Sequence, residues 1–122
     1  MRRPLRLVAL LAVSTLAVAS LASAQTLPRL VGKTGPAFTI SLKTASGARV
    51  TQVKAGTYTL VVTDRTGTDA HNFHLTGAGV DLKTTVGFVG TKTWRVRFQR
   101  GKTYRFVCDP HELAMHGSFR AV

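Results

Sequence analysis

The chain has 122 residues, a formal net charge of +12 and a single cysteine, Cys108. This length accommodates one small domain with a modest core, and a lone cysteine excludes a disulfide within the chain. The strong positive charge favours anionic partners, which include acidic proteins, anionic lipid and nucleic acid.

The first 24 residues have the pattern of a secretory signal peptide. Three arginines precede an apolar run from Leu7 to Leu21, and small residues suited to cleavage follow at 22–24. An uncleaved membrane anchor is the alternative, although the run is shorter than the roughly 20 residues of a spanning helix. We therefore expect a signal peptide at 1–24, a folded domain at 25–122, and export to the periplasm or the cell exterior. Without the leader the charge is about +9, and export makes nucleic acid the least favoured partner.

Beyond residue 30, apolar and polar residues alternate between glycines, which is typical of short β-strands. No segment has helical periodicity of useful length. With seven or eight short strands, we expect an all-β fold. The expected architecture is a two-sheet Greek-key β-sandwich that forms a single domain. The nine segments that could supply these seven or eight strands are, in chain order, Leu30–Gly32, 37–43, Val50–Val53, 57–63, His71–Leu75, Val86–Val89, 93–99, 103–108 and Ser118–Val122.

The alternation also predicts where reactive side chains point. In the strand at 71–75, His71 shares a face with two apolar residues and should point inward, whereas Asn72 and His74 share the opposite face, with His74 toward solvent. In the strand at 103–108, Cys108 shares a face with two aromatic residues, so it should also point inward.

A glycine-containing turn separates the last long pair of candidate strands. We expect residues 93–99 and 103–108 to form a β-hairpin across this turn. The outward positions of that hairpin would then hold Arg95, Arg97 and Arg105 as a basic stripe.

Three potential metal ligands follow one another after the strand that contains Cys108. Cys108, His111 and Met115 have the spacing C-x2-H-x3-M, and Pro110 restricts the backbone just before the histidine. His71 can add a fourth donor if the two strand ends are neighbours. Two imidazoles, one thiolate and one weak thioether are the ligand set of a blue-copper site. Coordination would also explain an unpaired thiol in an exported protein.

Each of these residues has a plainer interpretation. Cys108 could be a buried small hydrophobe, a reactive thiol or one half of an intermolecular bridge. His71 and Met115 could simply fill the core. Zinc accepts histidine and cysteine but rarely a thioether, so it fits the set less well than copper. The joint spacing favours copper over these readings.

Two segments resemble the cupredoxins, the plastocyanin and azurin group of small type 1 copper proteins. They are "HNFHL" at 71–75 and "YRFVCDPHELAMHGSF" at 104–119. The resemblance implies that His71, Cys108 and His111 are equatorial copper ligands and that Met115 is the axial one. It also implies that Asn72 lies behind the ligands, where it ties the two ligand loops together and supports the sulfur.

The ligand segment departs from the best-known members of that group. The usual plastocyanin loop has one more residue between its histidine and its methionine, so we expect Met115 to lie at a different distance or angle. His74 and His116 are extra imidazoles near the site in sequence, and we expect both to face solvent.

The resemblance implies an electron carrier and not an enzyme. Four protein ligands leave no open position for substrate, and the chain lacks the His-x-His pairs of multicopper oxidases. In the family, electrons leave through the exposed edge of the histidine on the cysteine loop, here His111. Leu113, Ala114 and residues 77–79 could supply an apolar patch around it. The alternatives are a copper-handling protein, such as a chaperone or buffer, and a metal-free interaction module.

Partners follow from charge and function. We expect a monomer that exchanges electrons with redox proteins. The basic stripe would favour acidic partners, and its charge would mainly raise their rate of association. Peripheral association with a membrane remains an option, and no nucleic-acid partner is expected.

Overall fold

The computed structural model describes residues 17–67 and 70–122, in which nine strands and one short 3-10 helix are formed. The all-β class is confirmed, with nine strands instead of seven or eight. The strands are β1 (Arg29–Thr34), β2 (Ile40–Thr44), β3 (Gln52–Val53), β4 (Gly56–Asp64), β5 (His74–Gly77), β6 (Val80–Lys83), β7 (Gly90–Phe98), β8 (Thr103–Val107) and β9 (His116–Ala121), and the helix is η1 (Asp109–His111).

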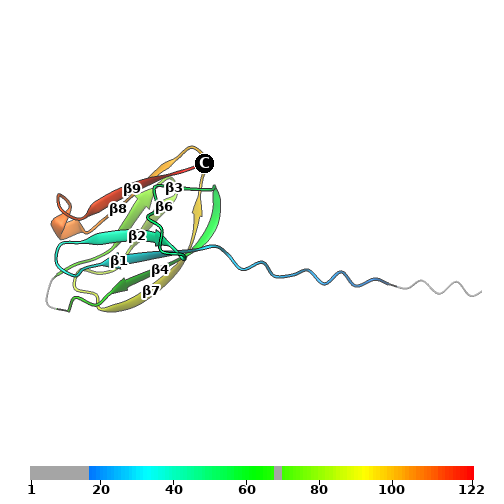
Figure 1. The fold of residues 1–122 in the computed structure, drawn as a ribbon, viewed down its shortest axis with the longest axis horizontal. Coiled ribbons are helices and arrows are strands. Elements are labelled where there is room, and N and C mark those ends of the chain that lie inside the picture. The colour runs from blue at the N-terminus through cyan, green and yellow to red at the C-terminus, as the bar shows by residue number, and fades with distance from the viewer. Residues whose placement is uncertain (1–16, 68–69) are drawn as a thin grey trace, which may run out of the picture.

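The strands form two sheets that pack face to face (Figure 1). The four-stranded sheet has the order β2-β1-β4-β7, and the five-stranded sheet has the order β3-β9-β8-β5-β6. Both are mixed, because β1 pairs with β4 and β3 pairs with β9 in parallel. Leu60 and Phe98 of one sheet and Tyr104 and Phe119 of the other are buried between them. The predicted two-sheet sandwich is therefore confirmed.

The predicted hairpin at 93–99 and 103–108 is wrong. Both strands exist, but β7 pairs with β4 in one sheet whereas β8 pairs with β5 and β9 in the other. The ring of Phe98 meets that of Tyr104 edge to face, with centroids 4.8 Å apart. The chain thus crosses from one sheet to the other between β7 and β8. This crossing lets the apolar faces of the two strands pack against each other. Arg95 and Arg97 consequently lie on a different sheet from Arg105, and the predicted stripe is not formed.

The candidate strand Val86–Val89 is also wrong. These residues form a turn and its exit, and Val86 and Val89 are more than half exposed. The strand in this region is β6 instead, which pairs with β5. The strand prediction from this short alternating stretch failed because the backbone turns near Gly87.

The N-terminal part of the chain extends away from the sandwich (Figure 1). Residues 17–28 have no regular secondary structure and are almost all exposed. The predicted signal peptide at 1–24 falls largely on residues 1–16, which lie outside the described residues, so it stays a prediction, as does the domain boundary. Within 17–67 and 70–122, we find no helix of the length and hydropathy needed to cross a membrane.

Candidate metal centre

Three neighbouring strand ends of the five-stranded sheet build the site. β5 and β8 are antiparallel partners, so the start of β5 lies beside the end of β8, and β9 begins next to them. His71 precedes β5, Cys108 follows β8, and His111 ends the 3-10 helix η1. Because these positions are fixed by strand pairing, residues 37 positions apart in sequence become spatial neighbours.

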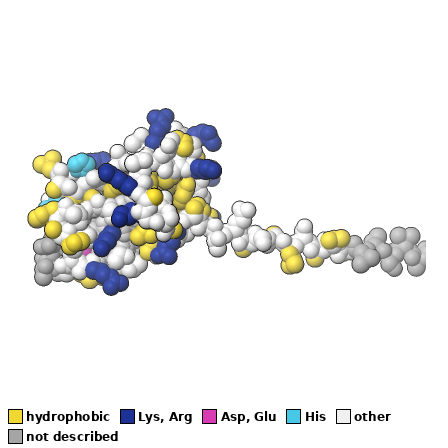
Figure 2. Space-filling view, viewed as in Figure 1, with side chains coloured by type: hydrophobic (Ala, Val, Ile, Leu, Met, Phe, Trp, Pro, Cys, Tyr) yellow, Lys and Arg dark blue, Asp and Glu magenta, His cyan; other side chains and the backbone are white. Residues whose placement is uncertain are grey.

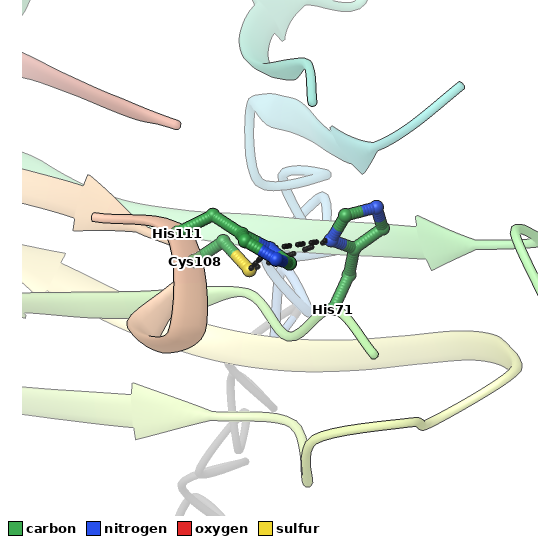
Figure 3. A group of neighbouring side chains, drawn as sticks. All are labelled: His71, Cys108 and His111. Atoms are coloured by element: carbon green, nitrogen blue, oxygen red, sulfur yellow. Dashed lines mark hydrogen bonds between the residues drawn. The ribbon is translucent and has the colours of Figure 1, made fainter. Parts of the chain in front are cut away.

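The donor atoms of these three residues converge on one point (Figure 3). The Nδ1 atoms of His71 and His111 are 3.2 Å apart. The sulfur of Cys108 is 3.6 Å from each of those nitrogens. His71 and Cys108 are fully buried, and His111 is half-buried. The inward orientation predicted for His71 and Cys108 is observed.

The spacing suits a single metal ion. Nitrogen and thiolate ligands bind metals such as zinc at about 2.0 to 2.3 Å, so one ion can reach donors that lie about 3 to 4 Å apart. His71 presents Nδ1 to the other two donors, whereas its Nε2 is buried without a hydrogen-bond partner among the described residues. The group therefore fits a metal with a preference for imidazole and thiolate.

Met115 lies on the same segment and its side chain is fully buried. The segment closes on itself through backbone hydrogen bonds. The amide of Cys108 donates to the carbonyl of Met115 over 3.0 Å, and the amide of Met115 donates to the carbonyl of His111 over 2.8 Å. These bonds hold the segment compact, and Met115 is its last residue before β9.

Asn72 joins the two parts of the site. Its side-chain oxygen accepts a hydrogen bond of 2.8 Å from the amide of Asp109, and its side-chain nitrogen donates to the carboxylate of Asp109 over 2.7 Å. The backbone amide of Asn72 points at the sulfur of Cys108, 3.5 Å away. Asn72 is buried and not on an outer face, because residues 71–73 precede β5 and do not follow its alternation.

The prediction that His74 faces solvent is wrong. Its side chain is only 18% exposed, because the ring lies between two carboxylates. Nε2 is 2.8 Å from Asp81, and Nδ1 is 2.9 Å from Asp109. His116, by contrast, is exposed as predicted, and its Nδ1 donates to the carbonyl of Glu112 over 2.8 Å.

The carboxylates shift the pKa of His74. Partial burial alone would lower the pKa of His74, but hydrogen bonds and charge attraction from Asp109 and Asp81 outweigh it and raise that pKa. For Asp109, burial acts to raise the pKa, and the hydrogen bonds from Asn72 and His74 together lower it. Both shifts favour the charged forms of the two groups, and Asp109 is next to the candidate ligand Cys108 in the chain.

The ring of Phe38 lies against the rings of His111 and His71, a contact that the sequence did not reveal. Its ring is edge-on to His111 with centroids 4.9 Å apart, and 6.1 Å from His71. Phe38 falls within the candidate strand predicted at 37–43, but β2 begins only at Ile40. The Gly35–Pro36 pair just before it is the one sequence signal for a loop at this point.

An apolar rim surrounds the half-buried edge of His111. Phe38, Leu113 and Ala114 line a shallow depression there, and Leu113 is 96% exposed. Residues 77–79 were also expected at this rim, which is wrong. That turn lies at the other end of β5, where the carbonyl of Ala78 accepts a hydrogen bond from the hydroxyl of Tyr104.

Comparisons with known proteins identify the fold. No protein-family model matches the chain, and no curated protein does. Among solved structures, the chain is similar to the copper protein rusticyanin (TM-score 0.59, 16% identity, 77% of this chain and 76% of that one). Reduced rusticyanin gives a TM-score of 0.57 at 18% identity over 77% and 78% of the two chains. Rusticyanin from Thiobacillus ferrooxidans gives 0.54 at 16% over 77% and 76%. The chain therefore has the cupredoxin fold, with a His-Cys-His group that fits a type 1 copper site.

Proposed function

We propose that this chain is an exported type 1 copper protein that carries single electrons between redox partners. The observation that carries the proposal is the convergence of His71, Cys108 and His111, with donor atoms 3.2 to 3.6 Å apart, at one end of a cupredoxin fold. Met115 would be the axial ligand, as its burial on the same segment supports. Copper bound there would supply one-electron exchange between Cu(I) and Cu(II).

The residues around the donors suit an electron carrier better than a catalyst. His71 and Cys108 are sealed from solvent, so a substrate would have no approach to them, whereas the edge of His111 reaches the surface within the apolar rim. Asn72 and the closed segment hold the donors in place before metal binds. Such preorganisation suits a site that must change charge with little movement.

Burial also weighs against the copper-handling alternative. A protein that passes copper to others needs a site from which the ion can be taken, and the thiol of Cys108 is fully buried. The signal-peptide pattern of the sequence supports export to the periplasm or cell exterior. Redox proteins are the proposed partners, and a monomer is the proposed state.

The first test is the visible spectrum of the protein with one equivalent of Cu(II), compared between the parent chain and Cys108→Ser. We expect the parent to develop a strong band at about 600 nm and to lose it reversibly on one-electron reduction. The serine variant should lack the band because a hydroxyl cannot replace the thiolate. His74→Gln is the control for an imidazole outside the donor group, since both ring nitrogens of His74 are bonded to carboxylates, and it should keep the band.

A weak, broad spectrum in the parent chain, or an unchanged band in Cys108→Ser, would contradict the proposal. Rapid loss of copper to a competing chelator would favour the copper-handling function instead.

A further inference from the structure

The outer face of the four-stranded sheet carries basic side chains and no acidic one among the described residues. Side chains alternate there between the core and the outside, and the outward positions of β4 hold threonine and valine. Five exposed cations occupy outward positions on the other three strands. We call them the basic face: Arg29, Lys33, Lys43, Arg95 and Arg97.

The strand register spreads these charges over the whole sheet. Arg29 lies beside Thr59, and Thr59 lies beside Arg95 on the next strand. Lys43 stands on the opposite edge strand, next to Val31 of β1. With strands about 4.8 Å apart, four strands place the cations across roughly 15 Å of sheet. The basic face is thus a broad surface and not a pocket around one small anion.

The exposed acidic side chains among the described residues belong to the other sheet and its loops. Asp81, Asp109 and Glu112 lie on the five-stranded sheet or in the loop between its strands β8 and β9, and each is held by a cation or histidine. Asp64, at the end of β4, is buried and accepts hydrogen bonds from Thr66.

None of the described ion pairs involves the basic face. Asp81 borders the same groove as Arg95 and Arg97, but its carboxylate is bonded to His74. Figure 2 shows many Lys and Arg side chains and very little acidic surface on one side of the domain. The positive charge of the basic face is therefore available to an external anion.

We propose that the basic face docks the protein on an anionic lipid surface, with the four-stranded sheet against the headgroups. A plane of lipid phosphates matches a broad sheet whose cations are separated by uncharged Thr and Val. Clustered Lys and Arg side chains bind anionic membranes in this way, and each contributes independently to the affinity.

The position of the metal centre favours lipid over an acidic redox protein, and this choice rests on the proposed function. His71, Cys108 and His111 all come from the five-stranded sheet and its loops, at one end of the sandwich. A redox protein on the basic face would lie against the other sheet, away from the half-buried edge of His111. A membrane at the basic face leaves that edge free for a partner.

The test compares two variants that lose the same charge. Lys33→Gln/Lys43→Gln/Arg95→Gln removes three cations of the basic face. Lys54→Gln/Lys102→Gln/Arg120→Gln removes three exposed cations on or beside the five-stranded sheet. The parent and both variants, each with the same N-terminus, are sedimented with vesicles of phosphatidylcholine alone or mixed with phosphatidylglycerol. Any contribution from residues 1–28 is then common to all samples.

We expect the parent to bind the anionic vesicles more tightly than the neutral ones and to be released by salt. Each cation near an anionic bilayer is worth about a fivefold change in affinity, so the basic-face variant should bind roughly 100-fold more weakly. The control variant should lose less than about tenfold, because its cations lie on or beside the five-stranded sheet. All six substituted side chains are exposed, and equal thermal unfolding of the three proteins checks that folding is intact.

Equal loss in the two variants would overturn the proposal, since net charge alone would then explain binding. So would equal binding of the parent to neutral and anionic vesicles. Binding of soluble polyglutamate that depends on the basic face, without binding to vesicles, would assign the surface to an acidic protein instead. None of these outcomes needs bound copper, so failure here is distinct from failure of the electron-carrier function.

Discussion

One aromatic side chain, Phe38, and one aliphatic side chain, Leu113, lie near His111 and differ in how much of the site they cover. The ring of Phe38 contacts the ring of His111 edge to face, whereas Leu113 projects almost completely into solvent. Water beside a copper site stabilises the more highly charged oxidised ion, and an apolar cover opposes this. The contact of Phe38 should therefore matter for the redox equilibrium, and that of Leu113 should not.

We predict that Phe38→Ala lowers the reduction potential of the copper-loaded protein, because water replaces the ring beside His111. Voltammetry of the parent and the variant measures the change. Leu113→Ala removes an exposed apolar residue from the same rim and serves as the control, with little change expected. A shift of the same size in both variants would refute a specific role for Phe38.

The pair formed by His74 and Asp109 predicts a pH dependence of stability. The pKa of His74 is raised above 6.5, so its stabilising contribution is complete below that pH and is lost as the pH rises through the raised pKa. The pKa of Asp109 is lowered below 3.8, so its contribution is present above that pH and is lost as the pH falls through the lowered pKa. Both contributions are present together between about pH 4 and 6.5.

We expect His74→Gln to lower the free energy of unfolding of the metal-free protein more at pH 5.5 than at pH 9. Urea unfolding of the parent and the variant at both values measures the difference. Metal-free protein is used because metal binding itself depends on pH. A destabilisation that does not change between the two values would contradict the linkage.

At the scale of elements, the pairing of β8 with β9 depends on a glycine close to the site. Gly117 lies opposite Phe106, and an added Cβ there would overlap the Phe106 ring. That ring is buried and stacks on Phe73, two residues after His71, with centroids 5.8 Å apart. The stacked rings of Phe106 and Phe73, with Gly117 against Phe106, therefore pack β8, β9 and the segment before β5 tightly together.

We predict that Gly117→Ala destabilises the protein by about 1 to 3 kcal/mol, because the ring of Phe106 must move within a packed core. Chemical denaturation measures the loss. Ser118→Ala, on the exposed face of the same strand, should change stability by less than about 0.5 kcal/mol. Similar losses in both variants would point to strand propensity and not to the packing of Phe106.

The local sequence pattern predicted which residues form the candidate site better than it predicted how the strands pair. Alternation led to the inward positions predicted for His71 and Cys108, and both are buried, but His71 precedes β5 and Cys108 follows β8, so neither belongs to an alternating strand. Alternation does not say which strand is the neighbour, so β7 and β8 were wrongly joined as a hairpin. The position of Phe38 over His111 and the acidic partners of His74 depend on contacts distant in sequence, which no local pattern contains.

At the scale of the whole molecule, the net positive charge should govern the rate of electron exchange with small ions. The exposed acids of the described residues are engaged by cations or histidine, so the field around the molecule is positive. Oxidation of the reduced copper protein by ferricyanide, an anion, should slow by roughly tenfold as ionic strength rises from 10 to 500 mM. Stopped-flow absorbance measures this rate.

A cationic oxidant, the tris-phenanthroline complex of cobalt(III), provides the comparison. Its rate should rise over the same range of ionic strength, because screening removes repulsion. If both oxidants respond in the same direction, long-range attraction is not the cause and the prediction fails.

All four candidate ligands come from one sheet, and this has a mechanical consequence. His71, Cys108, His111 and Met115 are attached to β5, β8 and β9, whereas the four-stranded sheet supplies none of them. Small sliding motions of one sheet over the other therefore leave the distances between the donors unchanged. Adsorption to, or mutation of, the four-stranded sheet would then change where the protein binds. It would not change the energy needed to rearrange the metal centre when an electron arrives.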